Sequence, residues 1–302
     1  MFKNILVPLD GSKLAETALP YAISFGRHFN APVTLLHVIE KDAPQEVHKD
    51  HHLTRPDEAE QYLTSLAQKG FPEDVEVEAH VHSAEVKDVA ASIIQIANEE
   101  FKPDLIVLCA HGQSGFRDLI FGSIAQKVLA GGQIPILLVQ SRTAESRPFT
   151  LRRIFVPLDS DSVHDDSLPF AEQLATAYDA EIYLLTVIPT YSTLSGEKAA
   201  ASSMLPATTT ALLDIQEETL KEHLQTHLDD LLKRGFKASA EVARGDPATL
   251  IAETAARVGA DLILLSTHRR AGMGAFWARS VAPNVVRKTR IPVFLIPHRD
   301  QE

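Results

Sequence analysis

Short apolar runs alternate along the chain with longer segments in which apolar residues recur every three or four positions. In the first half the runs predict strands at Asn4–Leu9, Val33–Ile39, Val75–His82, Leu105–Cys109 and Ile136–Val139. Near-continuous apolar runs such as Leu105-Ile106-Val107-Leu108 predict a parallel sheet that is covered on both faces. The alternation of strands with helical segments therefore predicts a doubly wound α/β layer.

The segment after the first predicted strand has the spacing of an amphipathic helix. Its apolar face is made of Leu14, Ala18, Tyr21, Ala22, Phe25 and Phe29. Pro20 lies inside this pattern and predicts a break or kink, because proline cannot donate the helical hydrogen bond.

The whole pattern occurs twice. Ile5-Leu6-Val7-Pro8-Leu9-Asp10 returns 149 positions later as Ile154-Phe155-Val156-Pro157-Leu158-Asp159. Ile134-Pro135 returns 157 positions later, as Ile291-Pro292, so the second copy gains a net eight residues, most of them expected in Pro189–Thr210. A repeat of this length predicts two homologous domains rather than a solenoid. We place them at residues 1–143 and 150–302, with a polar linker at 144–149.

Composition limits the class of protein and of partner. The formal net charge is −11, which disfavours binding to a phosphate backbone, so we expect no nucleic-acid partner. No apolar run is long enough to span a bilayer, so no membrane insertion is expected. Met1–Asn4 leads directly into a strand without the apolar region of a signal peptide. The single cysteine cannot form an internal disulfide, and a cytoplasmic location is expected.

One polar stretch, Lys41–Pro56, carries three histidines at positions 48, 51 and 52. Nearby histidines can bind a metal, but this stretch is polar and is not predicted to be helical, so it offers no helical i, i+4 ligand pair with a carboxylate. We therefore assign no metal site to the chain.

Asp10 ends the first strand and precedes Gly11-Ser12 and a helix. In an open doubly wound sheet, ligands bind beyond the carboxyl ends of the strands, where the strand order reverses. There the carboxylate could accept hydrogen bonds from ribose hydroxyls or from an adenine amine. Asp and Ser are also favoured at helix N-caps, so the local sequence alone equally allows a capping role.

A glycine-containing segment follows the fourth strand. It reads Ala110-His111-Gly112-Gln113-Ser114-Gly115, and Gly122-Ser123 then opens a predicted helix. Glycines let backbone N–H groups approach phosphate oxygens, and a helix N-terminus adds positive potential. Neither a Walker A pattern nor a compact GxGxxG is present, and a plain turn at the glycines would explain the segment equally well.

Taken together, the motifs resemble the universal stress protein family. The resemblance is carried by Ile-Leu-Val-Pro-Leu-Asp10-Gly-Ser, Leu-Leu-His-Val38, and Gly112 with nine residues to Gly122-Ser123, followed by Ile134-Pro135-Ile136. It extends over essentially the whole chain, twice. It implies two tandem doubly wound domains of the adenine nucleotide alpha hydrolase-like fold, each with a five-stranded parallel sheet flanked by helices. It further implies ATP as ligand, with Mg²⁺ on the phosphates.

The resemblance also implies a set of nucleotide-binding residues. Asp10 and Val38 would meet ribose and adenine, and Gly112, Gly122 and Ser123 would hold the phosphates. The complete expected set is Pro8, Leu9, Asp10, Val38, Leu108, Cys109, His111, Gly112, Gln113, Gly122, Ser123 and Ile124. Cys109 departs from the family pattern, which often has glycine where this loop begins. We interpret it as a buried packing residue rather than a redox thiol.

The second copy keeps Asp159 but has Arg269 and Arg279 where the first has Gly112 and Gly122. Their side chains would project into the space that phosphates need. The alternative is an arginine-lined anion site, because two guanidinium groups could hold an anion through side-chain contacts. We expect a degenerate second site and one nucleotide per chain.

These observations indicate a non-catalytic, ATP-binding stress-response or regulatory protein. The alternatives are a slow ATPase or adenylyl transferase on a related fold, and a pseudo-dimeric scaffold that binds no nucleotide. No candidate nucleophile has an identifiable partner in the sequence, and the His-x-Gly-His pattern of such transferases is absent.

Single-domain members of this family commonly pair through the strand after the proline-containing turn. Here that strand occurs twice, as Ile136–Val139 and Val293–Ile296. An exposed apolar edge strand favours pairing, and tandem linkage raises the effective concentration of the partner strand. We expect an intramolecular pseudo-dimer of the two domains. A further homodimer is compatible with it, and the sequence identifies no protein partner.

Overall fold

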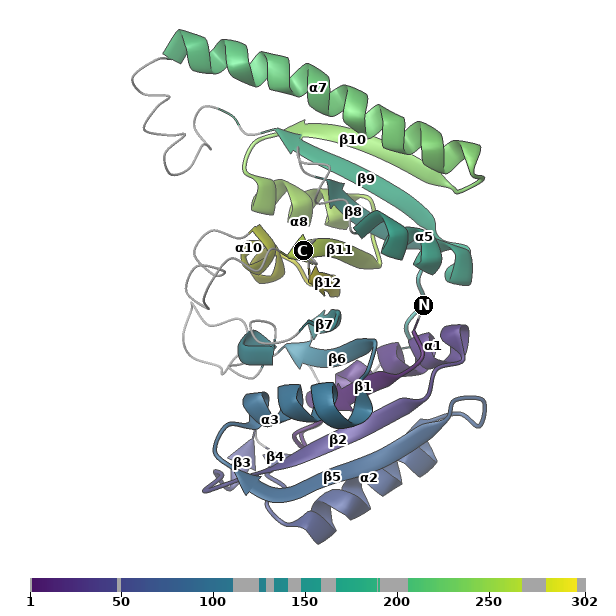
Figure 1. Ribbon diagram of the computed structural model, residues 1–302, viewed down its shortest axis with the longest axis vertical. Helices are drawn as coiled ribbons and strands as arrows, with labels where there is room; N and C mark the ends of the chain where they lie inside the picture. Colours follow the sequence, from purple (N-terminus) through teal and green to yellow (C-terminus); the bar gives the residue numbers. More distant parts are fainter. Residues whose placement is uncertain are drawn as a thin grey trace. The chain divides into compact units, whose positions relative to one another are not determined.

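The computed structural model describes residues 2–47, 50–110, 125–128, 133–140, 148–158, 167–188, 190, 206–267 and 281–297. Its described residues up to Thr150 form one compact unit, and those from Leu151 onward form a second (Figure 1). Among these residues, no helix combines the length and the apolar character that a membrane span requires.

The first unit is a parallel sheet whose described strands run in the order β5–β2–β1–β6–β7 (Figure 1). Its elements are β1 (Ile5–Pro8), η1 (Ala15–Ala18), α1 (Leu19–Phe29), β2 (Val33–Glu40), β3 (Glu46–Val47), β4 (Asp50–His51), α2 (Pro56–Gly70), β5 (Val77–Val86), α3 (Val89–Ile96), η2 (Ala97–Phe101), β6 (Leu105–Ala110) and β7 (Ile136–Gln140). Right-handed crossovers place α1 and α2 on one face and α3 on the other. The predicted doubly wound sheet is confirmed.

The second unit repeats this topology with the order β10–β9–β8–β11–β12, again parallel. Its elements are β8 (Arg153–Leu158), α5 (Ser167–Tyr178), β9 (Glu181–Ile188), α7 (Pro206–Lys233), β10 (Ala238–Arg244), α8 (Pro247–Arg257), β11 (Leu262–Thr267), α10 (Val281–Lys288) and β12 (Val293–Pro297). In both units the central strands are buried, as their continuous apolar sequences predict.

In each copy, an aspartate carboxylate accepts hydrogen bonds from the backbone at the start of the first strand. The Asp104 carboxylate accepts from the backbone N–H of Lys3 at 2.7 Å. Asp261, its counterpart in the second unit, accepts from Arg152 at 2.8 Å and from Arg153 at 3.0 Å. The repeat therefore extends from the apolar pattern to the polar contacts that order strand ends.

The expectation for Pro20 needs refinement. Pro20 does not kink a continuous helix: the 3₁₀ turn η1 ends at Ala18, and Pro20 lies in the first turn of α1. There its missing N–H leaves no helical hydrogen bond unmade. Within the polar stretch Lys41–Pro56, β3 and β4 pair in antiparallel fashion, and His52 is buried with Nδ1 3.1 Å from the Pro44 carbonyl oxygen. His48 lies outside the described residues.

Asp246 caps α8 and links the stability of the second unit to pH. Its carboxylate accepts from the Thr249 hydroxyl at 2.5 Å and from the Thr249 N–H at 2.9 Å, and these bonds lower the pKa of Asp246. We expect Asp246→Ala to cost about 1 kcal/mol of unfolding free energy at neutral pH. Because the folded-state pKa is depressed, the charge-dependent part is present above the unfolded pKa of about 3.9 and is lost as pH falls through the folded value.

Urea unfolding at pH 7 and pH 3 measures the loss of unfolding free energy in Asp246→Ala, with Asp246→Asn as the matched control. Asparagine keeps an acceptor for the helix N–H but carries no charge to titrate. The capping argument fails if Asp246→Ala leaves the unfolding free energy unchanged at pH 7.

Candidate functional site

The candidate site lies where the strand order of the first unit reverses, at the carboxyl ends of β1 and β6. The chain moves from β1 outward to β2 and β5, and then returns to the other side of β1 as β6 (Figure 1). The register pairs Pro8 with Leu36 and Leu6 with Ile106. Two residues beyond the pair Pro8–Leu36, the register brings Asp10 level with Val38. Three residues beyond the pair Leu6–Ile106, it brings Leu9 level with Cys109. Such a switch point is the usual ligand position in this architecture.

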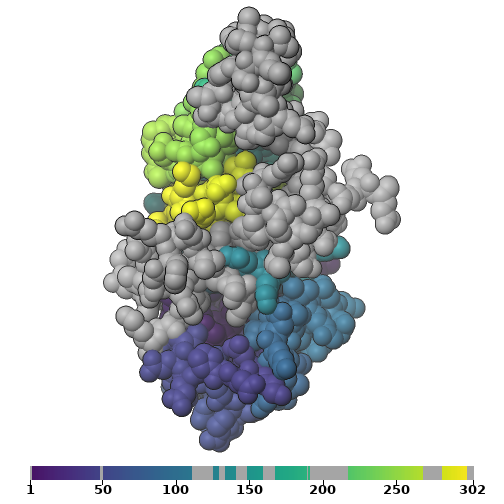
Figure 2. Space-filling view, turned by 90° about the vertical axis from the view of Figure 1, so that its left-hand side faces the viewer, coloured from purple at the N-terminus to yellow at the C-terminus, as the bar shows by residue number. Residues whose placement is uncertain are grey.

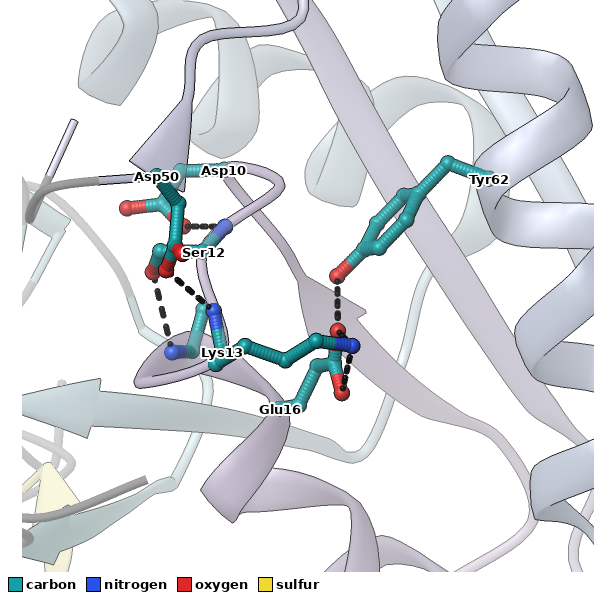
Figure 3. Close-up of polar contacts among 7 residues, drawn as sticks. Asp10, Ser12, Lys13, Glu16, Asp50 and Tyr62 are labelled. Atoms are coloured by element: carbon teal, nitrogen blue, oxygen red, sulfur yellow. Dashed lines mark hydrogen bonds and ion pairs between the residues drawn. The ribbon is translucent and has the colours of Figure 1, made fainter. Parts of the chain in front are cut away.

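The local turn holds the Asp10 carboxylate in one orientation. Its Oδ1 accepts from the Ser12 N–H at 2.9 Å and from the Ser12 hydroxyl at 2.7 Å (Figure 3). Ser12 is fully buried, and its Oγ accepts from the Ala15 N–H at 3.1 Å. The helix-capping contact at Ala15 therefore belongs to Ser12, while Asp10 orders the turn that leads to it. Asp10 itself is half-buried at the strand end.

Apolar residues surround this turn. Of the residues expected to contact the nucleotide, Leu9, Val38, Leu108 and Cys109 are buried, and Pro8 is half-buried at the end of β1. Cys109 is a free thiol whose sulfur lies 3.2 Å from the Thr17 hydroxyl, consistent with a packing role. Burial raises the pKa of the Tyr21 hydroxyl, and the neighbouring Cys109 raises it further.

The remaining expected residues lie outside the described part of the chain. They are His111, Gly112, Gln113, Gly122, Ser123 and Ile124 in the first copy, and Asp159, Arg269 and Arg279 in the second. Of the helix predicted after Ser123, the structure describes residues 125–128, which are helical. Ala125 and Val128 are buried there, as the apolar pattern of the segment indicates. Lys127 on this short stretch pairs with Asp88 at 2.9 Å.

The segment from Lys41 to Arg55, which we call the strap, contacts the Asp10 turn. Asp50 accepts from the backbone N–H of Lys13 at 2.9 Å, and so satisfies a donor ahead of η1 (Figure 3). Figure 2 shows the molecule from the side of the carboxyl ends of the strands. The indigo surface of the first unit belongs to the part of the sequence that includes the strap. The sequence could not reveal this contact, because Asp50 and Lys13 are 37 positions apart.

His37 joins the strap to the end of β1. The ring is buried, with Nδ1 2.8 Å from the Leu9 carbonyl oxygen and Nε2 3.0 Å from the Leu53 carbonyl oxygen. A neutral imidazole has one N–H and satisfies one of these carbonyls, whereas the protonated ring donates to both. His37 belongs to the motif Leu-Leu-His-Val, and its role is to hold the backbone before Asp10.

The polar groups around this turn are mainly acidic. Glu16 receives bonds from Lys13 Nζ at 2.8 Å and from the Tyr62 hydroxyl at 3.2 Å (Figure 3). Burial and the nearby charges of Glu16, Asp10 and Asp50 raise the pKa of Tyr62 far above its ordinary value, so the phenol stays protonated. In the described residues, no group of three or more His, Cys, Asp or Glu side chains could hold a metal ion.

Gly11 makes the close approach of the strap possible. Its φ of +89° is in the left-handed region, and a Cβ there would lie 2.8 and 2.9 Å from two Leu53 side-chain carbons. We expect Gly11→Ala to lower the unfolding free energy by about 1–2 kcal/mol, because both the backbone conformation and the contact oppose a side chain. Urea unfolding measures the change.

Gly70→Ala is the matched control, since no atom lies within 4 Å of its Cβ position and its φ is not in the left-handed region. It should leave stability unchanged or raise it slightly. Equal effects of the two substitutions would contradict the steric argument, and adding Leu53→Ala to Gly11→Ala separates the contact from the backbone strain.

Comparisons with known proteins decide the family. The sequence pattern of the universal stress protein family matches residues 1–140 and again residues 150–297. The chain belongs to the universal stress protein family. Both halves of the chain are members, as the tandem motifs predict.

Relatives differ in how much of this tandem protein they match. The universal stress protein MJ0531 of Methanocaldococcus jannaschii is 25% identical over 153 residues, which cover 48% of this chain and 86% of the relative. A universal stress protein structure from Archaeoglobus fulgidus covers 99% of this chain and 97% of its own, with a TM-score of 0.71 and 18% identity. A putative universal stress protein from Pseudomonas aeruginosa covers 98% and 93%, with a TM-score of 0.67 and 17% identity. The two solved structures share the fold over the full tandem length.

Proposed function

We propose that this universal stress protein is a non-catalytic regulatory protein that binds one ATP in its first domain. The observation that carries the proposal is the Asp10 turn. A half-buried carboxylate is held at the switch point of the sheet by Ser12, beside buried apolar residues of β1, β2 and β6. Such a site fits a nucleoside, because a carboxylate accepts from ribose hydroxyls and an apolar wall covers a base.

Charge favours one orientation of the nucleotide. Asp10, Asp50 and Glu16 all lie near the Tyr62 hydroxyl, so the side of the turn beneath the strap is acidic. Phosphates would be repelled there, whereas neutral ribose and adenine would not. The triphosphate would therefore extend in the other direction, toward the glycine segment that follows β6. Gly112, Gly122 and Ser123 are the residues we assign to it, with Mg²⁺ held on the phosphates rather than by a protein cluster.

Analysis of the purified protein for bound nucleotide tests this function. Denaturation followed by chromatography should release adenine nucleotide, or the stripped protein should bind ATP in calorimetry. Failure of both measurements would favour the alternative of a nucleotide-free scaffold.

Catalysis is expected to be absent or very slow. His111 is the only acid–base candidate in Ala110–Gly115, and no candidate nucleophile has an identifiable partner in the sequence. Prolonged incubation with ATP and phosphate detection should give a turnover far below about 1 per second, the lower end for ordinary enzymes. A turnover above that value would point to the alternative of an ATPase or adenylyl transferase.

We further propose that the two domains associate within one chain through the strands β7 and β12. Both are short and apolar, and each ends the sheet of its own unit. An experimental structure or a cross-linking map tests the pairing, which is wrong if Leu138 and Leu295 lie on opposite outer edges of the molecule. The cytoplasmic location expected from the sequence also remains part of the proposal.

A further inference from the structure

Helix α7 of the second unit carries two histidines whose rings face each other. His223 and His227 are one turn apart, and their Nε2 atoms lie 3.1 Å from each other. The ring planes are inclined at 87°, with centroids 4.4 Å apart. Leu220, Leu224 and Leu231 form the buried stripe of the same helix, and both histidines are half-buried beside it. Solvent can therefore reach the pair, while the packed helix fixes its spacing.

The separation of the two nitrogens matches two ligands of one metal ion. With metal–nitrogen distances of about 2.05 Å, a separation of 3.1 Å corresponds to an angle at the ion of about 98°. This value lies between the ideal angles of square-planar and tetrahedral coordination, about 90° and about 109°.

The ring positions distinguish this arrangement from a head-on hydrogen bond. Two imidazoles aligned nitrogen to nitrogen at 3.1 Å would place their centroids about 5.4 Å apart, whereas two rings converging on one ion place them about 4.8 Å apart. The observed centroid distance of 4.4 Å is shorter than the head-on value, so the two rings do not meet nitrogen to nitrogen along one line.

We propose that His223 and His227 form a two-histidine site for a borderline divalent transition-metal ion such as Cu²⁺, Ni²⁺ or Zn²⁺. Imidazole nitrogen favours these ions, whereas Mg²⁺ and Ca²⁺ prefer oxygen ligands. The described residues hold no group of three or more potential ligands, and we assign the remaining coordination positions to water. The site lies on the second unit and does not depend on the nucleotide proposed for the first.

Titration of the untagged full chain with Cu²⁺ tests the proposal. Calorimetry should detect one site, and electron paramagnetic resonance of the complex should show hyperfine coupling to two imidazole nitrogens. His223→Asn and His227→Asn should each weaken Cu²⁺ binding at least tenfold, because either change leaves a single imidazole. His80→Asn is the matched control: His80 is a half-exposed histidine on β5 of the first unit and should leave the affinity unchanged.

A second measurement distinguishes loss of the metal site from loss of folding in the variants. Zn²⁺ should raise the melting temperature of the parent and of His80→Asn, since a ligand of the folded state stabilises it, but not that of the two α7 variants. Circular dichroism of the variants should match that of the parent. The proposal is overturned if the parent signal lacks two nitrogen ligands, or if His80→Asn reduces binding as much as the α7 substitutions.

Discussion

Replacing Gly122 by arginine should lower the affinity of the chain for ATP by at least about 100-fold, with the fold unchanged. The second copy already has arginine at the equivalent position, 279, so the substitution reproduces a natural difference between the two halves. A long side chain would occupy the space of the phosphates, and glycine's backbone freedom would be lost. A loss of about 3 kcal/mol in phosphate contacts corresponds to that change in affinity.

Calorimetry with ATP, together with circular dichroism, measures the effect. Gly70→Arg is the control for an added cation, because no atom lies within 4 Å of the Gly70 Cβ position. It should bind ATP as the parent does. An unchanged affinity in Gly122→Arg would remove the argument that this glycine segment holds phosphates.

Removing the Asp10 carboxylate should weaken ATP binding by about 1–3 kcal/mol, the range for a lost hydrogen bond to a charged group. Asp10→Ala also removes the acceptor of the Ser12 N–H and hydroxyl, so it disturbs the turn as well as the proposed ribose contact. Asp10→Asn separates the two effects, because its amide oxygen can still accept from Ser12 while the charge is lost.

Ser12→Ala is the second control for this prediction. It removes the hydroxyl that donates to Asp10 and accepts from Ala15, but leaves the carboxylate in place. We expect Asp10→Ala to have the largest effect on ATP affinity of the three variants. If Ser12→Ala weakens binding as much as Asp10→Ala, the carboxylate acts through the turn and not on the ribose.

The sheet could be predicted from the sequence because its signal is local. Apolar runs such as Leu105–Cys109 mark buried parallel strands, and the repeated motifs made the two halves comparable position by position. Asp10 could be placed at the carboxyl end of the first strand for the same reason, whereas the reversal of strand order beside it is seen only in the structure.

The contacts of the strap could not be predicted, because they depend on tertiary packing. Nothing in the composition of Lys41–Arg55 indicates that Asp50 accepts from the Lys13 N–H, or that Leu53 packs against Gly11. The double contact of His37 with two backbone carbonyls likewise requires the strap to be in place. The pairing of His223 with His227 is visible as a spacing of four, but the ring geometry is not.

The central claim is that nucleotide binds to the first domain and not to the second. Calorimetric titration of the nucleotide-free chain with ATP and Mg²⁺ tests it most directly, because it gives the number of sites per chain. We predict one site in the parent protein and none in Gly122→Arg. Two equivalents of bound ATP, or one that persists in Gly122→Arg, would contradict the account.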